Sequence, residues 1–203
     1  EAFDWDGEYF HLKNVLGEPK PASHVPIFNA AGSEFGRTFA VDNADFLFTP
    51  AIDLARSKEE LVVLKQQAAD AGRDVGVLTF AHVICRPTEQ EALDYLEHTA
   101  NTNADWAAVD NLVRLQFAHA ESFPHDLLAL IRDRFAAGHG GYPLIGTPEQ
   151  VADGIMAIHE AGFAGTTLSF VDYAEEFPYF RDTVLPILEA RGLRTPRAAS
   201  AAA

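Results

Sequence analysis

Short apolar segments alternate with longer amphipathic segments along most of the chain. The runs at 27–29, 45–48, 75–84 and 166–171 predict strands, and each is followed by at least one segment with helical periodicity. Short strands that alternate with helices indicate a parallel sheet with helices packed outside it, so we predict an α/β fold. Four such units fit either an open doubly wound sheet or half of a closed eight-stranded barrel.

End signals mark several of the predicted helices. Ser57 with Glu60, and Thr88 with Glu91, have the spacing of capping boxes, and Thr147-Pro148-Glu149-Gln150 combines an N-cap with a proline at the first helical position. Pro178 and Pro186 are expected to bend or interrupt the last helix. The predicted helices are 34–43, 57–71, 89–101, 104–117, 124–137, a helix from 147 that ends at Gly162, and 175–191.

Other segments predict turns and connectors. Residues 3–13 alternate apolar and polar positions around Asp6-Gly7, which predicts a β-hairpin. Three prolines in 16–26 predict an extended connector. The segment 138–146 contains too many glycines for a helix and predicts a loop with the freedom that closure over a ligand requires. The alanine-rich tail 195–203 is predicted to be disordered.

Length and charge narrow the classes of function. The 203 residues suit one domain or part of a larger one, and the formal net charge of −15 argues against binding to nucleic acid or to anionic membranes. No apolar run is long enough to span a membrane. The single cysteine, Cys85, excludes an internal disulfide framework and fits the cytoplasm. Because the chain begins at Glu1 and in the middle of a pattern, we expect a further N-terminal portion.

The first predicted strand and helix form a candidate anion site. Residues 27–37 run from a buried strand through Ala30, Ala31 and Gly32 into a helix that begins near Ser33. Such a turn leaves backbone N–H groups free at the positive end of the helix dipole, where phosphate commonly binds. Ser33 either caps the helix or donates its hydroxyl to a phosphate oxygen. Asn29, at the end of the strand, points either toward a ligand or into the core.

Further candidates follow the later strands and the glycine-rich loop. His139 and Tyr142 lie in that loop and could close over a substrate. After the last strand, Phe170 is interpreted as core packing and Asp172 as a helix cap. His82 is interpreted as a buried histidine with its hydrogen bonds satisfied, and Cys85 as structural. The acidic groups at 53–60 and 175–176 are interpreted as solvated surface near helix starts.

The histidines do not predict a metal site. His119 and His125 lack the spacing of four residues that places two ligands on one helix face, and neither has a cysteine nearby. We therefore assign no metal and no catalytic triad.

Five segments, in order, resemble the bacterial luciferase-like flavin monooxygenases. FDWDGEYF at 3–10 precedes a P-K-P segment, NAAGSEFGR at 29–37 precedes ADFLF at 44–48, and GTPEQVADGI occupies 146–155. LSFVDYAEEFPYF at 168–180 resembles the ending of the branch that contains pyrimidine, dimethyl-sulfide and dimethyl-sulfone monooxygenases. Trp5 interrupts the first motif, and Gly32 stands where the family has a serine.

The resemblance implies a (β/α)₈ barrel of which residues 1–194 form the C-terminal half, about strands five to eight. It implies an FMNH₂-dependent monooxygenase that uses O₂ to oxygenate a small nitrogen- or sulfur-containing organic substrate at the carboxyl ends of the strands. Ser33 falls on a family serine that contacts the FMN phosphate. The implied cofactor residues are Ser33, Gly32 and Asn29, and the candidate pocket residues are His139, Tyr142, Ser169 and Phe170.

The resemblance also implies partners. A separate flavin reductase would supply reduced FMN in a transient encounter, and the protein would form a dimer or tetramer. Two alternatives remain open: a deazaflavin-dependent oxidoreductase of the same superfamily, and a non-catalytic flavin-binding or truncated half-barrel that associates with another chain.

Overall fold

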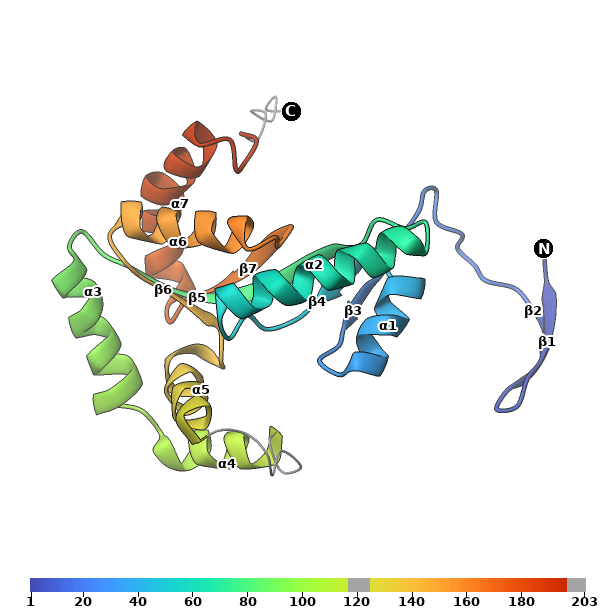
Figure 1. Cartoon of the computed structure of the whole chain (residues 1–203), viewed down its shortest axis with the longest axis horizontal. Helices are drawn as coiled ribbons and strands as arrows, with labels where there is room; N and C mark the ends of the chain where they lie inside the picture. Colours follow the sequence, from blue (N-terminus) through green and yellow to red (C-terminus); the bar gives the residue numbers. More distant parts are fainter. Residues whose placement is uncertain (117–124, 197–203) are drawn as a thin grey trace.

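The computed structural model describes residues 1–116 and 125–196 (Figure 1). Most of the tail that is predicted to be disordered, one end of each of two predicted helices and His119 lie outside the described residues. None of the described helices is long and apolar enough to cross a membrane.

Four parallel strands form the sheet in chain order. β3 (Phe28–Ala30) pairs with β4 (Phe46–Phe48), β4 pairs with β5 (Gly76–Cys85), and β5 pairs with β7 (Gly165–Ser169). The predicted strands are therefore present, and the parallel α/β fold is confirmed. Because parallel strands all point the same way, their carboxyl ends gather at one edge of the sheet.

A fifth strand, β6 (Tyr142–Gly146), extends this sheet. It pairs with the last five residues of β5, beyond the segment that pairs with β4. Ala81 and His82 of β5 have partners in both β6 and β7, so these two strands lie on opposite sides of β5. The prediction that 138–146 is wholly a loop is wrong for its second half, because the long β5 offers a free edge that the apolar YPLIG segment can pair with.

Residues that lie side by side in neighbouring parallel strands share a face of the sheet. Leu47 of β4 pairs with Val77 of β5, and both are fully buried in the main core. This face is covered by helices α1 (Glu34–Asn43), α2 (Leu54–Asp70), α6 (Pro148–Glu160) and α7 (Tyr173–Ala190), whose buried side chains join the same core. We call it the helix-covered face.

The opposite face carries aromatic side chains that are only partly covered. Phe28 stacks on Phe46 with ring centroids 4.7 Å apart, and Phe48 stacks on Phe80 at 5.8 Å. Phe28 retains 58% of its accessible surface. We call this the open face. The segment between β5 and β6 forms α3 (Glu89–Leu96), the π-helical turn η1 (Glu97–Thr102), α4 (Trp106–Gln116) and α5 (His125–Gly138). The C-terminal part of α5 lies against the open face, where Gly138 contacts His82.

Local capping explains most helix starts. The capping boxes at Thr88–Glu91 and Thr147–Gln150 are both formed, with Pro148 in the first turn of α6. The capping box predicted at Ser57 is wrong. Instead, Asp53 caps α2 by accepting a hydrogen bond from the backbone N–H of Arg56 at 2.8 Å, and Ser57 is buried inside the helix. An aspartate beside the positive helix end is as good a cap as serine, so the helix begins one turn earlier.

The last helix is continuous through both of its prolines. α7 contains Pro178 and Pro186 and buries Phe180, Val184 and Leu188 in the core. Apolar burial around each proline offsets the loss of a backbone hydrogen bond, so the predicted interruption does not occur.

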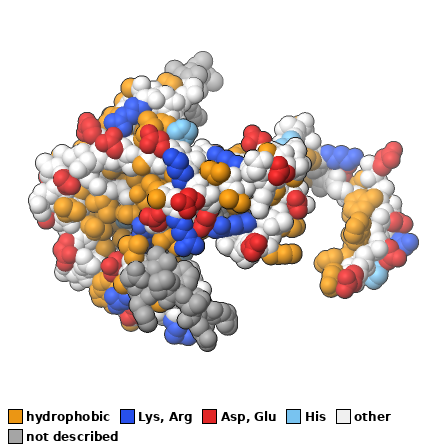
Figure 2. Space-filling model, viewed as in Figure 1, with side chains coloured by type: hydrophobic (Ala, Val, Ile, Leu, Met, Phe, Trp, Pro, Cys, Tyr) orange, Lys and Arg blue, Asp and Glu red, His pale blue; other side chains and the backbone are white. Residues whose placement is uncertain are grey.

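An N-terminal hairpin lies apart from the sheet, joined to it by the proline-containing connector (Figure 1). β1 (Phe3–Asp6) and β2 (His11–Val15) pair antiparallel, and the N–H of Gly7 donates to the carbonyl of Phe10 at 2.9 Å. The predicted hairpin is therefore confirmed, with a loop at 7–10. Trp5 is 57% exposed and Phe10 68% exposed, and hydrophobic side chains form a band along the hairpin (Figure 2).

Candidate functional site

The turn that follows β3 leads directly into α1. Ser33 is the N-cap of α1, and its Oγ accepts a hydrogen bond from the N–H of Gly36 at 3.1 Å. A hydroxyl that accepts one hydrogen bond still has its own proton to donate, so capping and phosphate binding are compatible roles for Ser33. No atom lies within 4 Å of where a side chain on Gly32 would begin, so space is open beside the turn.

Asn29 lies on the helix-covered face of β3. It pairs in register with the buried Leu47, which places it on the helix-covered face. Its Oδ1 is buried and has no hydrogen-bond partner among the described residues. Of the two orientations considered for Asn29, the structure therefore favours the core.

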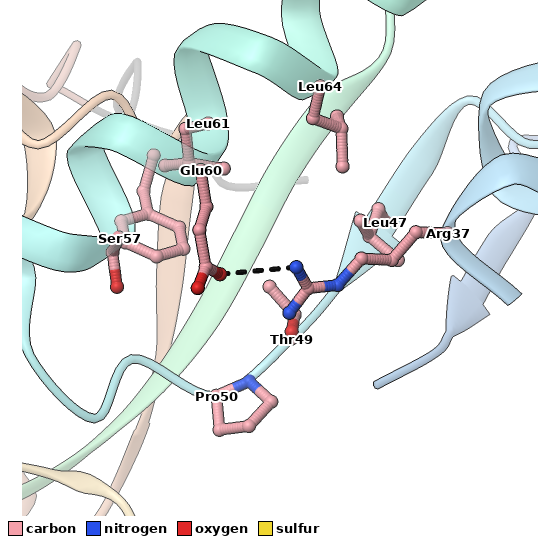
Figure 3. A pocket seen from close by; sticks show the side chains of 9 residues that line it. Arg37, Leu47, Thr49, Pro50, Ser57, Glu60, Leu61 and Leu64 are labelled. Atoms are coloured by element: carbon pink, nitrogen blue, oxygen red, sulfur yellow. Dashed lines mark hydrogen bonds and ion pairs between the residues drawn. The ribbon is translucent and has the colours of Figure 1, made fainter. Parts of the chain in front are cut away.

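A cleft beneath the carboxyl end of β4 contains an ion pair (Figure 3). The side chain of Arg37 extends from α1 toward Glu60 on α2, and its Nη1 donates to Oε2 of Glu60 at 3.1 Å. The cavity is about 20 Å³, close to the minimum of roughly 10–15 Å³ that a single water needs. It is too small for a flavin or a substrate, so we assign this ion pair the role of joining α1 to α2.

A larger apolar pocket lies at the carboxyl end of the sheet. Its volume is about 260 Å³, and Phe80 of the open face forms part of its wall. Ile131 and Phe135 of α5 form another part, and the turn after α5 adds His139, whose ring lies 5.3 Å from that of Phe135. The lining residues are Pro50, Ile52, Phe80, Gln116, Ile131, Arg134, Phe135, His139 and Gly140. None of them is acidic.

The candidate pocket residues are separated by the fold. His139 lines the apolar pocket, but Tyr142 begins β6 and packs against the main core. Phe170 is 8% exposed and packs edge-on against Phe180, as expected for core packing. Asp172 caps α7 by accepting hydrogen bonds from the N–H groups of Ala174 and Glu175, as predicted.

Ser169 lies beside His82 on the open face. The two are register partners, and Ser169 Oγ donates to the carbonyl of Ala81 at 3.3 Å and lies 3.4 Å from Nδ1 of His82. His82 is 3% exposed, so the prediction that it is buried is confirmed. Its Nε2 has no hydrogen-bond partner among the described residues, so the expectation that its hydrogen bonds are satisfied holds there for Nδ1 alone. A side chain on Gly138 would collide with the imidazole, which explains the glycine there.

Burial lowers the pKa of His82, and the nearby Glu176 carboxylate only partly opposes this. The unfolded chain, with an ordinary histidine pKa near 6.5, therefore takes up a proton at a higher pH than the folded protein does. We expect the free energy of unfolding to be largest above pH 6.5 and to fall as the pH drops below it, by at most about 1.4 kcal/mol per pH unit. Urea titrations from pH 8 to 5.5, for the wild type and His82→Gln, measure the difference. Identical slopes for the two proteins would contradict the assignment.

Glu176 does not belong to the solvated surface, which corrects the sequence-based expectation. Its side chain is 6% exposed and accepts a hydrogen bond from Arg86 Nη2 at 2.7 Å, and it also accepts from the N–H of Asp172 at 2.9 Å. Arg86 in turn lies 3.9 Å above the ring of Tyr95. The ion pair fastens the end of β5 to the start of α7.

Cys85 behaves as a structural residue. Burial raises the pKa of its thiol to about 11, so at neutral pH it carries almost no thiolate. In the part of the chain that the structure describes, no three His, Cys, Asp or Glu side chains gather as a metal site.

A second large cavity, of about 470 Å³, lies at the amino ends of the strands, with His24, Asp45 and Lys65 in its wall. Ligands of α/β proteins bind at the carboxyl ends, so the smaller pocket there is the better candidate. Sequence reasoning missed Phe80, Arg134 and Phe135 in that pocket. In the sequence, these residues are recognisable only as members of an apolar strand or of an amphipathic helix. Residues in such segments usually pack in the core, so the pattern does not distinguish a pocket residue from a core residue.

Comparisons with known proteins identify similar sequences and structures. A family model described as luciferase-like monooxygenase matches residues 1–165. The chain is 28% identical over 192 residues to an FMNH₂-dependent dimethylsulfone monooxygenase of Pseudomonas fluorescens (strain Pf0-1), covering 93% of this chain and 53% of that protein. It is 27% identical over 213 residues to the pyrimidine monooxygenase RutA of Allorhizobium ampelinum, covering 98% of this chain and 56% of that protein.

Among solved structures, DmoA from Hyphomicrobium sulfonivorans superposes with a TM-score of 0.80 at 22% identity, covering 96% of this chain and 48% of that one. The chain therefore spans about half the length of the curated relatives it matches.

Proposed function

Because the chain belongs to the luciferase-like monooxygenase family, we propose that it forms the C-terminal half of a flavin-dependent monooxygenase. The substrate would be a small organic molecule containing nitrogen or sulfur, as the names of its relatives suggest. The observation that carries this proposal is the turn at Gly32–Ser33, which places a free hydroxyl and the N-terminus of α1 at the carboxyl end of β3.

Three features support the half-barrel. β3, β4, β5 and β7 are parallel and follow one another in chain order, as strands five to eight of a barrel would. Within the described residues, the outer strands β3 and β7 each pair along one edge only, which leaves two edges available for further strands. The open face bears partly exposed phenylalanines, which the interior of a closed barrel would bury.

The residues at the turn fit the phosphate of FMN. Ser33 keeps a proton to donate, and Gly32 leaves room for close approach to the backbone. Glu34 in the first turn of α1 opposes an anion, whereas the helix dipole attracts one. The cofactor, when bound, supplies the electrons and the oxygen-transfer chemistry with O₂. The chain's own residues hold its phosphate at Ser33, and the apolar pocket around Phe80 excludes water from the substrate.

Substitutions at Ser33 test the cofactor site. Ser33→Asp keeps a good helix cap, yet it removes the hydroxyl donor and places a carboxylate beside the phosphate. We expect Ser33→Asp to abolish FMN binding, measured by flavin fluorescence quenching, with little change in the melting temperature. Ser33→Ala, which loses a hydrogen bond to a charged group, should weaken binding about tenfold, or roughly 1–2 kcal/mol.

Ser33→Thr serves as the matched control, because it keeps both the cap and the donor. If FMN binds the wild type and Ser33→Asp equally well, the phosphate site is not at this turn. If FMN binds neither this chain nor, where the gene extends upstream, the extended protein, the monooxygenase proposal fails. Competition between FMN and a deazaflavin on the same proteins decides between the two cofactors.

A further inference from the structure

The two arginines of α5 have opposite surroundings. Arg132 pairs with Asp110, with Nε donating at 2.5 Å and Nη2 at 3.3 Å, and its guanidinium lies 4.1 Å from the ring of Trp106. Among the described residues, Arg134 makes no ion pair with a carboxylate, and the one hydrogen bond of its side chain runs from Nη1 to the carbonyl of Ala51 at 3.2 Å. Its guanidinium lies 5.5 Å from the ring of Tyr142.

The charge of Arg134 is withdrawn from water without full compensation. Its Nε is buried and has no partner among the described residues. Burial lowers the pKa of Arg134, and the more distant Tyr142 and Asp53 oppose this only weakly, whereas the hydrogen bond to Asp110 raises the pKa of Arg132. The charge of a half-buried cation without a partner is stabilised when an anion binds beside it.

Arg134 lies in the wall of the apolar pocket at the carboxyl end of the sheet. Phe80 and Phe135 also line this pocket, and none of the described residues that line it is acidic. The volume of about 260 Å³ is just below the roughly 300–1,000 Å³ typical of drug-sized ligands, so the occupant is small. An apolar cavity with one cationic wall selects a molecule with an apolar body and a negatively charged end.

We propose that this pocket binds a short-chain organic oxyanion, with its apolar body between Phe80 and Phe135 and its charged group against the guanidinium of Arg134. Arg134 is then the residue that sets the charge preference of the pocket. That the bound anion is a substrate rests on the proposed function; that the pocket binds an anion does not.

Two probes of nearly equal shape isolate the charge. Hexanoate and hexanamide differ only in replacing a carboxylate by a neutral amide, and their binding to the 203-residue chain is measured by isothermal titration calorimetry. We expect the wild type to bind hexanoate at least tenfold more tightly than hexanamide. Arg134→Gln should reduce this preference to about one by weakening hexanoate alone, and Arg134→Lys should keep part of it.

Arg132→Gln is the matched control, because it removes an arginine from the same helix that does not line the pocket. It should leave the preference for hexanoate unchanged. Melting temperatures identify a variant that has lost its fold, and Arg134→Lys keeps the test valid if Arg134→Gln does not fold.

Equal binding of the two probes to the wild type, no binding of either, or an equal loss of preference in Arg132→Gln would each overturn the inference, and Arg134 would then serve only to hold the chain at Ala51. FMN titrations on the same samples separate the two hypotheses. Hexanoate selectivity without FMN binding would support the anion pocket and count against the proposed cofactor.

Discussion

Glu176→Ala is expected to lower the free energy of unfolding by about 3–5 kcal/mol, because it leaves the positive charge of Arg86 buried without its partner. The side chains of Arg86 and Glu176 are 21% and 6% exposed, and 2.7 Å separates Arg86 Nη2 from Glu176 Oε1. Removing Glu176 also takes away the acceptor for the backbone N–H of Asp172, at the first turn of α7. Guanidinium chloride unfolding followed by circular dichroism measures the change.

Two further variants show whether the loss comes from an unpaired charge. The double variant Arg86→Met with Glu176→Leu removes both charges at once, so it should recover most of the stability lost in Glu176→Ala. Asp182→Ala breaks the exposed Arg181–Asp182 pair, whose side chains are 55% and 60% exposed, and should change the free energy of unfolding far less than Glu176→Ala does. A double variant as unstable as Glu176→Ala would mean that the charge is not the cause.

Phe180→Ala is expected to destabilise the fold by about 3–5 kcal/mol through the cavity it leaves in the core. Phe180 is 1% exposed, and its ring centroid lies 5.5 Å from that of Phe170, the residue that follows β7. Thermal unfolding by calorimetry measures the loss. Phe177→Ala provides the comparison, since Phe177 also contacts the ring of Phe170 but is 45% exposed, and it should cost much less. Equal losses for the two variants would contradict this account.

The sequence predicts the features of this fold that depend on neighbouring residues. The boundaries of α1 coincide with the predicted 34–43, and the capping boxes at Thr88 and Thr147 form as predicted. Each depends on residues three or four positions apart, so the pattern contains the whole interaction. The strands could be found for the same reason, because short apolar runs that end at nearby turn residues are distinguished from helices by their length and their flanking positions.

Features that depend on distant residues could not be predicted in this way. Glu176 resembles any acidic residue at a helix start until β5 brings Arg86 beside it, ninety positions earlier in the chain. β6 can form because β5 is longer than β4, so the last residues of β5 remain available to pair with β6. The candidate site also contains one part that depends on neighbouring residues and one part that depends on distant residues. The Ser33 turn is local and could be predicted, whereas Arg134 enters the pocket only because α5 packs back onto the open face near Phe80.

The way in which β5 and β6 pair makes residues 87–141, which follow the Arg86–Glu176 ion pair, a long insertion whose two ends are held together by the sheet. The segment leaves the sheet at Cys85 and returns at Tyr142, and the two strands that frame it are hydrogen-bonded neighbours from Ala81–Tyr142 to Cys85–Gly146. A loop whose ends are already joined can be replaced without disturbing the scaffold below it. Most of the described residues that line the apolar pocket come from this segment, namely Gln116, Ile131, Arg134, Phe135, His139 and Gly140. Exchanging the segment between relatives is therefore expected to change which ligand the pocket prefers, while the Ser33 turn stays in place.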